Sequence, residues 1–139
     1  MSRQSDLKHA LHNEEVFLHL LPNEKFADWI VNTAFYAALH FVDYKIFPLT
    51  FSERGIQIKI DDIDSYAVSM LNKHNNDKHV CRIKLVETKL RPIAYEFNWL
   101  FSACKNARYN DFNFTDPQKT CELAKKHLAA IKDFCYPVK

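Results

Sequence analysis

Glycine is almost absent from this chain of 139 residues, which contains only Gly55. A protein built from sheets needs several residues at positive φ for its tight turns, so this scarcity favours long helices joined by few connections. The chain also lacks the GxGxxG and Walker patterns, whose glycines let the backbone approach phosphate groups, and the GxSxG pattern of serine hydrolases. These absences exclude many classes of enzyme.

Long apolar runs and paired cysteines are missing as well. No segment approaches the roughly 18 consecutive apolar residues that a membrane-spanning helix needs, and residues 1–15 contain no apolar run of the signal-peptide type. The cysteines are widely spaced and form no CxxC pair: Cys81, Cys104, Cys121 and Cys135. We therefore expect a cytoplasmic protein with reduced thiols and no membrane partner.

Apolar residues at helical spacing are plentiful. Two helices are predicted over residues 5–21 and 23–46, with Pro22 between them. The apolar face of the first includes Leu11 and Leu18, and that of the second includes Phe26 and Trp29. Spacings of three and four alternate over residues 83–107 and again over residues 121–135, where Asp116 and Pro117 can start the helix, so two more helices are predicted.

Pro92 lies inside the third predicted helix. The apolar pattern stays in phase across it, so we expect the proline to bend this helix near Thr88 without ending it. Eleven Phe, six Tyr and two Trp supply bulky side chains for a core. The sequence therefore predicts one all-α domain over residues 1–139, an antiparallel four-helix bundle.

A different pattern separates the second and third helices. Ile56, Ile58 and Ile60 alternate with polar residues, a period of two that is typical of a strand, and a turn-like SERG segment precedes them. We expect a short β-hairpin insertion at about residues 45–61, followed by a short helix at about residues 62–71.

A line of polar residues interrupts the otherwise apolar second helix. Its members recur at spacings of four, four and three, which places them on one line of the helix: Asn32, Tyr36, His40 and Asp43. We expect this line to face His79 and Arg82 of the third helix. It forms either an internal hydrogen-bonded network or the floor of a binding cleft in which Asp43 orients the His40 imidazole.

Positive charge is concentrated in the second half of the chain. Residues 1–77 hold seven Lys or Arg and eleven Asp or Glu, whereas residues 78–139 hold twelve and six. Part of this charge forms a predicted anion- or RNA-binding stripe on the third helix: Lys84, Arg91, Lys105 and Arg108, with Tyr109 able to stack on a base. The alternative is that these cations pair with the acidic first half, for example with Glu14, Glu15 or Asp28.

His74, His79 and Cys81 lie close together in the sequence and have side chains of metal-ligand type. Their H-x4-H-x-C spacing matches no common zinc pattern, so we expect no metal and no other cofactor. Four aromatic residues are expected to be too exposed for a small monomer, which predicts a homodimer: Phe47, Phe51, Trp99 and Phe101.

Two segments resemble the HEPN superfamily of prokaryotic helical bundles. The likeness covers residues 24–46 and 78–135, and it is strongest in FYAALH of the second helix and ARYNDF at the end of the third. The predicted hairpin has no place in the minimal bundle of that family and is an insertion. The resemblance implies an all-α, often dimeric protein of an RNA-directed defence, toxin–antitoxin or stress system.

Active members of the superfamily are metal-independent ribonucleases with an R-x4–6-H motif near the last helix. The arginine holds the scissile phosphate and the histidine takes part in proton transfer. Here only Arg3 with His9 has that spacing, on the first helix, which we interpret as chance. The sequence thus leaves open a divergent ribonuclease, an RNA-binding partner, and a catalytically inert module that binds a protein or a small ligand.

Overall fold

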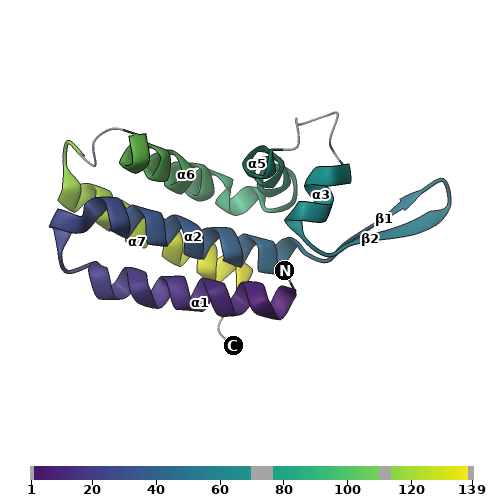
Figure 1. Ribbon diagram of the computed structural model, residues 1–139, viewed down its shortest axis with the longest axis horizontal. Helices are drawn as coiled ribbons and strands as arrows, with labels where there is room; N and C mark the ends of the chain where they lie inside the picture. The colour runs from purple at the N-terminus through teal and green to yellow at the C-terminus, as the bar shows by residue number, and fades with distance from the viewer. Residues whose placement is uncertain (1, 70–76, 110–113, 138–139) are drawn as a thin grey trace.

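The computed structural model describes residues 2–69, 77–109 and 114–137, and within them it is mostly helical, as predicted. Four long helices run lengthwise (Figure 1): α1 (Arg3–Leu20), α2 (Ala27–Ile46), α6 (Ala94–Tyr109) and α7 (Pro117–Cys135). Two shorter helices and a hairpin lie toward one end: α3 (Ile63–Ser69), α5 (Lys78–Lys89), β1 (Leu49–Glu53) and β2 (Ile56–Ile60). Short 3-10 turns, η1 (Glu24–Phe26) and η2 (Arg91–Ile93), precede α2 and α6.

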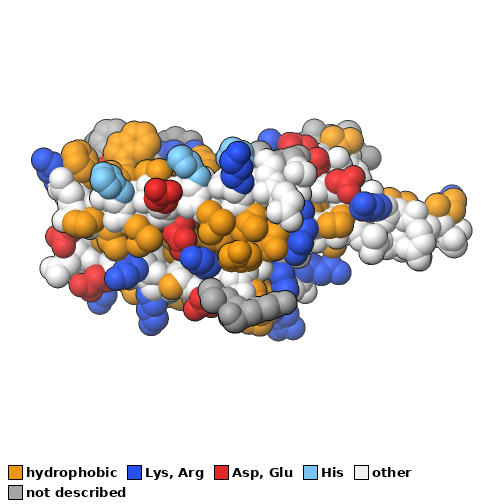
Figure 2. Space-filling view, turned by 90° about the horizontal axis from the view of Figure 1, so that it is seen from below, with side chains coloured by type: hydrophobic (Ala, Val, Ile, Leu, Met, Phe, Trp, Pro, Cys, Tyr) orange, Lys and Arg blue, Asp and Glu red, His pale blue; other side chains and the backbone are white. Residues whose placement is uncertain are grey.

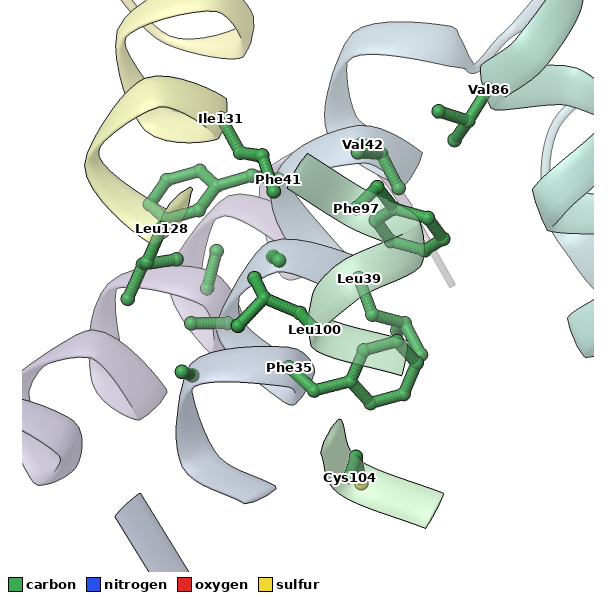
Figure 3. Packing of buried hydrophobic residues seen from close by; sticks show 14 of the residues in the cluster. Phe35, Leu39, Phe41, Val42, Val86, Phe97, Leu100, Cys104, Leu128 and Ile131 are labelled. Atoms are coloured by element: carbon green, nitrogen blue, oxygen red, sulfur yellow. The ribbon is translucent and has the colours of Figure 1, made fainter. Parts of the chain in front are cut away.

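Helix α2 is the centre of the molecule. It contacts α1, α6 and α7, and twelve of its twenty residues are buried. Figure 3 shows Phe41 pointing toward Leu128 and Ile131 of α7. On the α6 side, the Phe35 ring lies 5.7 Å from the ring of Phe97. Because α2 is covered on several sides, its few polar residues must either pair internally or line hollows.

The apolar faces of the first two helices are less complete than predicted. Leu11 and Leu18 are 36% and 51% exposed, because α1 turns Ala10 and Phe17 toward α2 and these leucines follow one position later. Phe26, at 40% exposed, lies in η1 before the α-helix begins, so the helical spacing does not apply to it. Trp29 was expected in the core and is 58% exposed.

The predicted continuous third helix is wrong. Helix α5 ends at Lys89, and Leu90 has non-helical angles of φ −126° and ψ 44°. Pro92 lies at the start of η2, where its missing N–H costs no hydrogen bond, and the preceding residue is disfavoured in α-helix. Figure 1 shows α5 nearly end-on and α6 lengthwise, so the two helices point in different directions.

Burial on both sides of this break nevertheless follows the predicted apolar pattern. Val86, Leu90, Ile93, Phe97 and Leu100 are all buried. The last helix also agrees with its pattern, since every predicted apolar position is buried: Cys121, Ala124, Leu128, Ile131 and Cys135. The Asp116 side chain accepts a hydrogen bond of 3.1 Å from the backbone N–H of Lys119 and so caps α7, as predicted.

The predicted hairpin is present. Strands β1 and β2 are antiparallel, and the two turn residues Arg54 and Gly55 have φ values of 53° and 79°. A two-residue hairpin turn favours positive φ at both positions, which explains why the single glycine of the chain is placed there. The hairpin extends from the body as an arm (Figure 2), and α3 follows it within the predicted segment.

The expectation of four exposed aromatic residues is confirmed only for one of them. Phe51 of the hairpin is 37% exposed, but Phe47 is 2% exposed because it lies at the end of α2 against the core. Trp99 and Phe101 are half-buried against the same core. The four cysteines are free and buried. None of the described helices is long and apolar enough to span a membrane.

Candidate functional site

The polar line of α2 runs past two hollows, each of about 440 Å³, and Tyr36 lines both. The first, which we name the acidic cleft, lies among α1, α2, α3 and α5. Its lining residues are Asp6, Tyr36, Leu39, His40, Asp43, Asp62, Ile63, Asp64, Asp77, Lys78, His79 and Arg82. The second, which we name the aromatic pocket, lies among α1, α2 and α6. Its lining residues are Asn13, Asp28, Trp29, Asn32, Thr33, Tyr36 and Arg108.

A buried ion pair joins α2 to α5 at the acidic cleft. The Arg82 guanidinium donates to both carboxylate oxygens of Asp43, with Nε–Oδ1 and Nη2–Oδ2 distances of 2.8 and 2.9 Å. The two residues are only 5% and 4% exposed. Desolvation raises the pKa of Asp43, and the guanidinium acts in the opposite direction by favouring the ionised carboxylate. The N–H groups that Arg82 could offer to a ligand are therefore bonded to Asp43.

A second acidic group, which the sequence analysis missed, is the partner of His40. The Asp6 carboxylate of α1 lies 3.0 Å from His40 Nδ1, and its side chain is 4% exposed. The expectation that Asp43 orients His40 is therefore wrong, because the stronger Arg82 contact holds Asp43. Asp6 lies on the inward side of α1, next to Leu7. Because a buried charge needs a partner, an acidic residue on an inward face predicts a polar or cationic side chain facing it.

His79 lies at the start of α5, half-buried between aromatic rings. Its ring centroid is 5.5 Å from that of Phe101 and 6.0 Å from that of Phe35. Burial and the nearby Arg82 charge lower the pKa of His79, which favours the neutral imidazole at pH 7. The structure thus brings Tyr36, His40, Asp43, His79 and Arg82 to one cleft, while Asn32 lies at the other hollow.

The remaining charged groups of the cleft also have protein partners. The Lys78 ammonium lies 2.9 Å from Asp64 Oδ1. Asp62 accepts from the backbone N–H of Ser65 at 2.8 Å, and Asp77 caps α5 by accepting from His79 N. Five aspartates face one lysine and one arginine, so the lining carries net negative charge. This charge opposes phosphate and favours a cation.

The aromatic pocket is lined instead by exposed aromatic side chains. Trp29 and Tyr36 are 58% and 39% exposed. Asn32 Oδ1 accepts a hydrogen bond of 3.0 Å from the Cys104 thiol, and the Asn13 amide nitrogen donates to the His9 carbonyl at 2.9 Å. The pocket combines aromatic rings, amide groups and the guanidinium of Arg108. Such a lining can stack on a planar ring and bond its edge.

The predicted basic stripe does not lie on one continuous helix. Lys84 lies on α5, Arg91 in η2, and Lys105 and Arg108 on α6, so the helix break at Leu90 separates Lys84 from the other three. Lys105 Nζ lies 5.3 Å from the centroid of Phe101, one turn before Arg108. Tyr109 ends α6, and its side chain lies outside the described residues.

Pairing between the acidic and basic halves does occur, through other cations. Glu14 accepts from Lys132 at 2.8 Å, in addition to the pairs that Asp43 and Asp64 form. Within the described part of the chain, Lys84, Arg91 and Lys105 form no ion pair. Neither Glu15 nor Asp28 takes part in these pairs.

The H-x4-H-x-C group, at which no metal was expected, lies only partly within the described residues. His74 lies outside the described residues, and Cys81 is a buried thiol whose pKa is raised by desolvation. Across residues 2–69, 77–109 and 114–137, no three His, Cys, Asp or Glu side chains are arranged to hold a metal ion.

Comparisons of the chain with protein-family models, with curated proteins and with solved structures found no match. Functional arguments for this protein therefore depend on the chemistry of the two hollows.

Proposed function

We propose that this chain is a HEPN-like helical bundle that binds RNA without cleaving it, as the RNA-binding partner of a prokaryotic defence or toxin–antitoxin system. The observation that carries the proposal is the aromatic pocket, where exposed Trp29 and Tyr36 lie in one hollow with Arg108. Stacking rings beside a fixed cation are the usual elements of single-stranded RNA recognition. Lys105, one turn from Arg108 on α6, adds a second positive charge nearby.

The absence of cleavage is inferred from the acidic cleft. A metal-independent ribonuclease needs a cation that can hold the scissile phosphate beside a titratable base. The cleft contains imidazole groups, but Arg82 is buried and bonded through two N–H groups to Asp43. Arg3, the arginine of the R-x4–6-H spacing, donates instead to the Tyr44 carbonyl at 3.1 Å. These contacts support binding over catalysis.

Incubation with RNA tests both parts of this proposal. Purified protein is mixed with total RNA and with transfer RNA, with and without a chelator, and both binding and product lengths are measured. We expect a complex that weakens as salt rises, because cations that neutralise phosphates release counterions, and we expect intact RNA. Cleavage in the presence of chelator would identify a divergent ribonuclease. Absence of any salt-sensitive complex would remove the RNA-directed function.

A second candidate function is favoured by the charge of the acidic cleft. With five aspartates in its lining, the cleft suits a cationic small ligand or a basic segment of a cognate protein. This corresponds to a catalytically inert binding module. Thermal stabilisation by spermidine, a probe with several amines, would support it, and an unchanged melting temperature at millimolar spermidine would count against it.

We also propose that the protein is a homodimer. Exposed apolar residues on several elements are consistent with a further interface: Phe51 and Ile56 of the hairpin, Val68 of α3, and Leu18 of α1. Light scattering at micromolar concentration distinguishes the mass of a dimer from that of a monomer.

A further inference from the structure

We infer that the aromatic pocket holds one unpaired nucleobase of a single-stranded RNA, stacked against Trp29. This inference rests on the proposed RNA-binding function and specifies its site. The hollow of about 440 Å³ is within the range of small-ligand pockets and accommodates a nucleoside, whereas an RNA helix is far too large for it.

The exposure of Trp29 is the first argument. Tryptophan buries more apolar surface than any other side chain, so leaving 58% of it exposed forgoes stabilisation that the fold could have used. Among the described residues, Trp29 forms no ring contact, whereas Tyr36 is held edge-on by Phe35 at 5.5 Å. A ring fixed at the first turn of α2 with an open face is suited to stacking on a base.

The amide groups are the second argument. Asn32 uses its carbonyl oxygen on the Cys104 thiol, so its amide nitrogen is left as a donor for a ligand. Asn13 uses its amide nitrogen on the His9 carbonyl, so its side-chain oxygen is left as an acceptor. The pocket therefore offers one donor and one acceptor beside the Trp29 ring. Each nucleobase carries both kinds of group on its edge.

The position of Arg108 is the third argument. Arg108 lines the same hollow from the last turn of α6, and Lys105 lies one turn earlier on the same helix. A stacked base brings its own phosphate within reach of the pocket rim, where a guanidinium can bond a phosphate oxygen. The acidic cleft, which lies on the other side of Tyr36, repels the same phosphate.

Trp29 fluorescence provides the test. In a Trp99→Phe background, Trp29 is the only tryptophan. The probes are a single-stranded adenosine decamer RNA and the same decamer paired with a uridine decamer. We expect the single strand to quench Trp29 and to bind at least tenfold more tightly than the duplex. Binding without quenching, or equal affinity for the two forms, would overturn the assignment of this pocket to an unpaired base.

A second experiment compares the RNA affinity of matched variants and does not depend on Trp29 fluorescence. In fluorescence anisotropy with a dye-labelled decamer, Trp29→Ala is expected to weaken binding roughly tenfold, as loss of one stacked base requires. Tyr95→Ala removes an aromatic side chain that is 69% exposed but lies outside the pocket, and it should leave affinity unchanged. Circular dichroism checks that both variants remain folded.

Charge variants separate this inference from the proposed function. Arg108→Glu is expected to weaken decamer binding and to reduce the dependence on log salt by about one unit per phosphate contact. Lys125→Glu, at an exposed position on α7 outside the pocket, is the matched control and should leave binding unchanged. If wild type binds RNA and Trp29→Ala binds equally well, the pocket inference fails and the RNA-binding function stands. If wild type binds neither the decamer nor total RNA, both fail.

Discussion

The two hollows that Tyr36 lines have the same volume but differ in the kinds of side chain that line them. In the acidic cleft, the charged side chains are bonded to other parts of the protein, as Asp43 is to Arg82 and Asp6 is to His40. In the aromatic pocket, Trp29 and Tyr36 keep much of their surface exposed. Polar residues on one line of one helix therefore have two different roles.

The difference predicts that substitutions at the two hollows change different properties of the protein. The Asp6–His40 contact joins α1 to α2, and the Asp43–Arg82 ion pair joins α2 to α5. Removing one member leaves a buried charge without a partner, which is costly. The Trp29 ring of the aromatic pocket is 58% exposed, so its loss should change binding more than stability.

The largest expected effect is the loss of the Asp43 carboxylate. Asp43→Ala leaves the Arg82 guanidinium buried at 5% exposure without its partner, so we expect the free energy of unfolding to fall by about 3–5 kcal/mol. Urea unfolding followed by circular dichroism measures this change. Trp29→Ala, at the other hollow, is the comparison and should cost well under half as much.

A double variant separates the effect of the unpaired charge from that of lost packing. Asp43→Leu combined with Arg82→Met replaces the ion pair by apolar side chains of similar size. Such replacements are often neutral or stabilising, so we expect most of the lost stability to return. A double variant as unstable as Asp43→Ala would show that the shape of the pair, and not its charge, is what the cleft requires.

Acid should destabilise the fold through two histidines, His79 at the cleft and His127 on α7. Burial lowers the pKa of His79 and of His127 from the ordinary value of 6.5, and His127 Nδ1 is a buried nitrogen without a hydrogen-bond partner in the described structure. The unfolded chain then binds protons more readily than the folded chain. Stability is therefore fully present above pH 6.5 and is lost as pH falls through the folded-state values.

Unfolding in urea at pH 7.5 and pH 5.5 measures this dependence. We expect His127→Leu and His79→Leu each to reduce the loss of stability between the two pH values. His12→Gln, exposed on α1, is the control and should leave the loss as it is in wild type. A pH dependence that survives both leucine substitutions would assign acid sensitivity to other groups.

The helical fold class was predictable because it depends on local pattern. Apolar spacing identified the buried residues on both sides of Pro92 and along α7, and the turn chemistry around Gly55 identified the hairpin. Continuity of the third helix was not predictable from this spacing. Apolar residues on two successive helices can keep the same spacing when both helices pack on one core. The spacing therefore identifies buried residues but does not show whether the helix continues in the same direction.

The candidate site was predictable to the extent that residues share an element. The line from Asn32 to Asp43 follows from helical spacing, and three of its members lie with His79 and Arg82 at one cleft. The contact between Asp6 and His40 was missed because the two residues are far apart in the sequence. The only local indication was an acidic residue on the inward face of α1. Arg108 was assigned to a stripe with Lys84, but it lies on α6 and lines the same hollow as Trp29.

The smallest expected effect concerns the ion pair between Glu14 of α1 and Lys132 of α7. It tests whether burial is the reason that the Asp43–Arg82 pair is expected to matter so much for stability. Its Nζ–Oε1 distance of 2.8 Å matches the shortest distance in the Asp43–Arg82 pair, but its side chains are 18% and 27% exposed. Water and salt therefore screen it, and we expect a coupling energy of less than about 1 kcal/mol. A double-mutant cycle with Glu14→Gln and Lys132→Gln measures this coupling, which should shrink further in high salt. A coupling as large as that of the cleft pair would mean that distance alone, without desolvation, sets the strength of these contacts, and the contrast between a buried cleft and an open pocket would lose its physical basis.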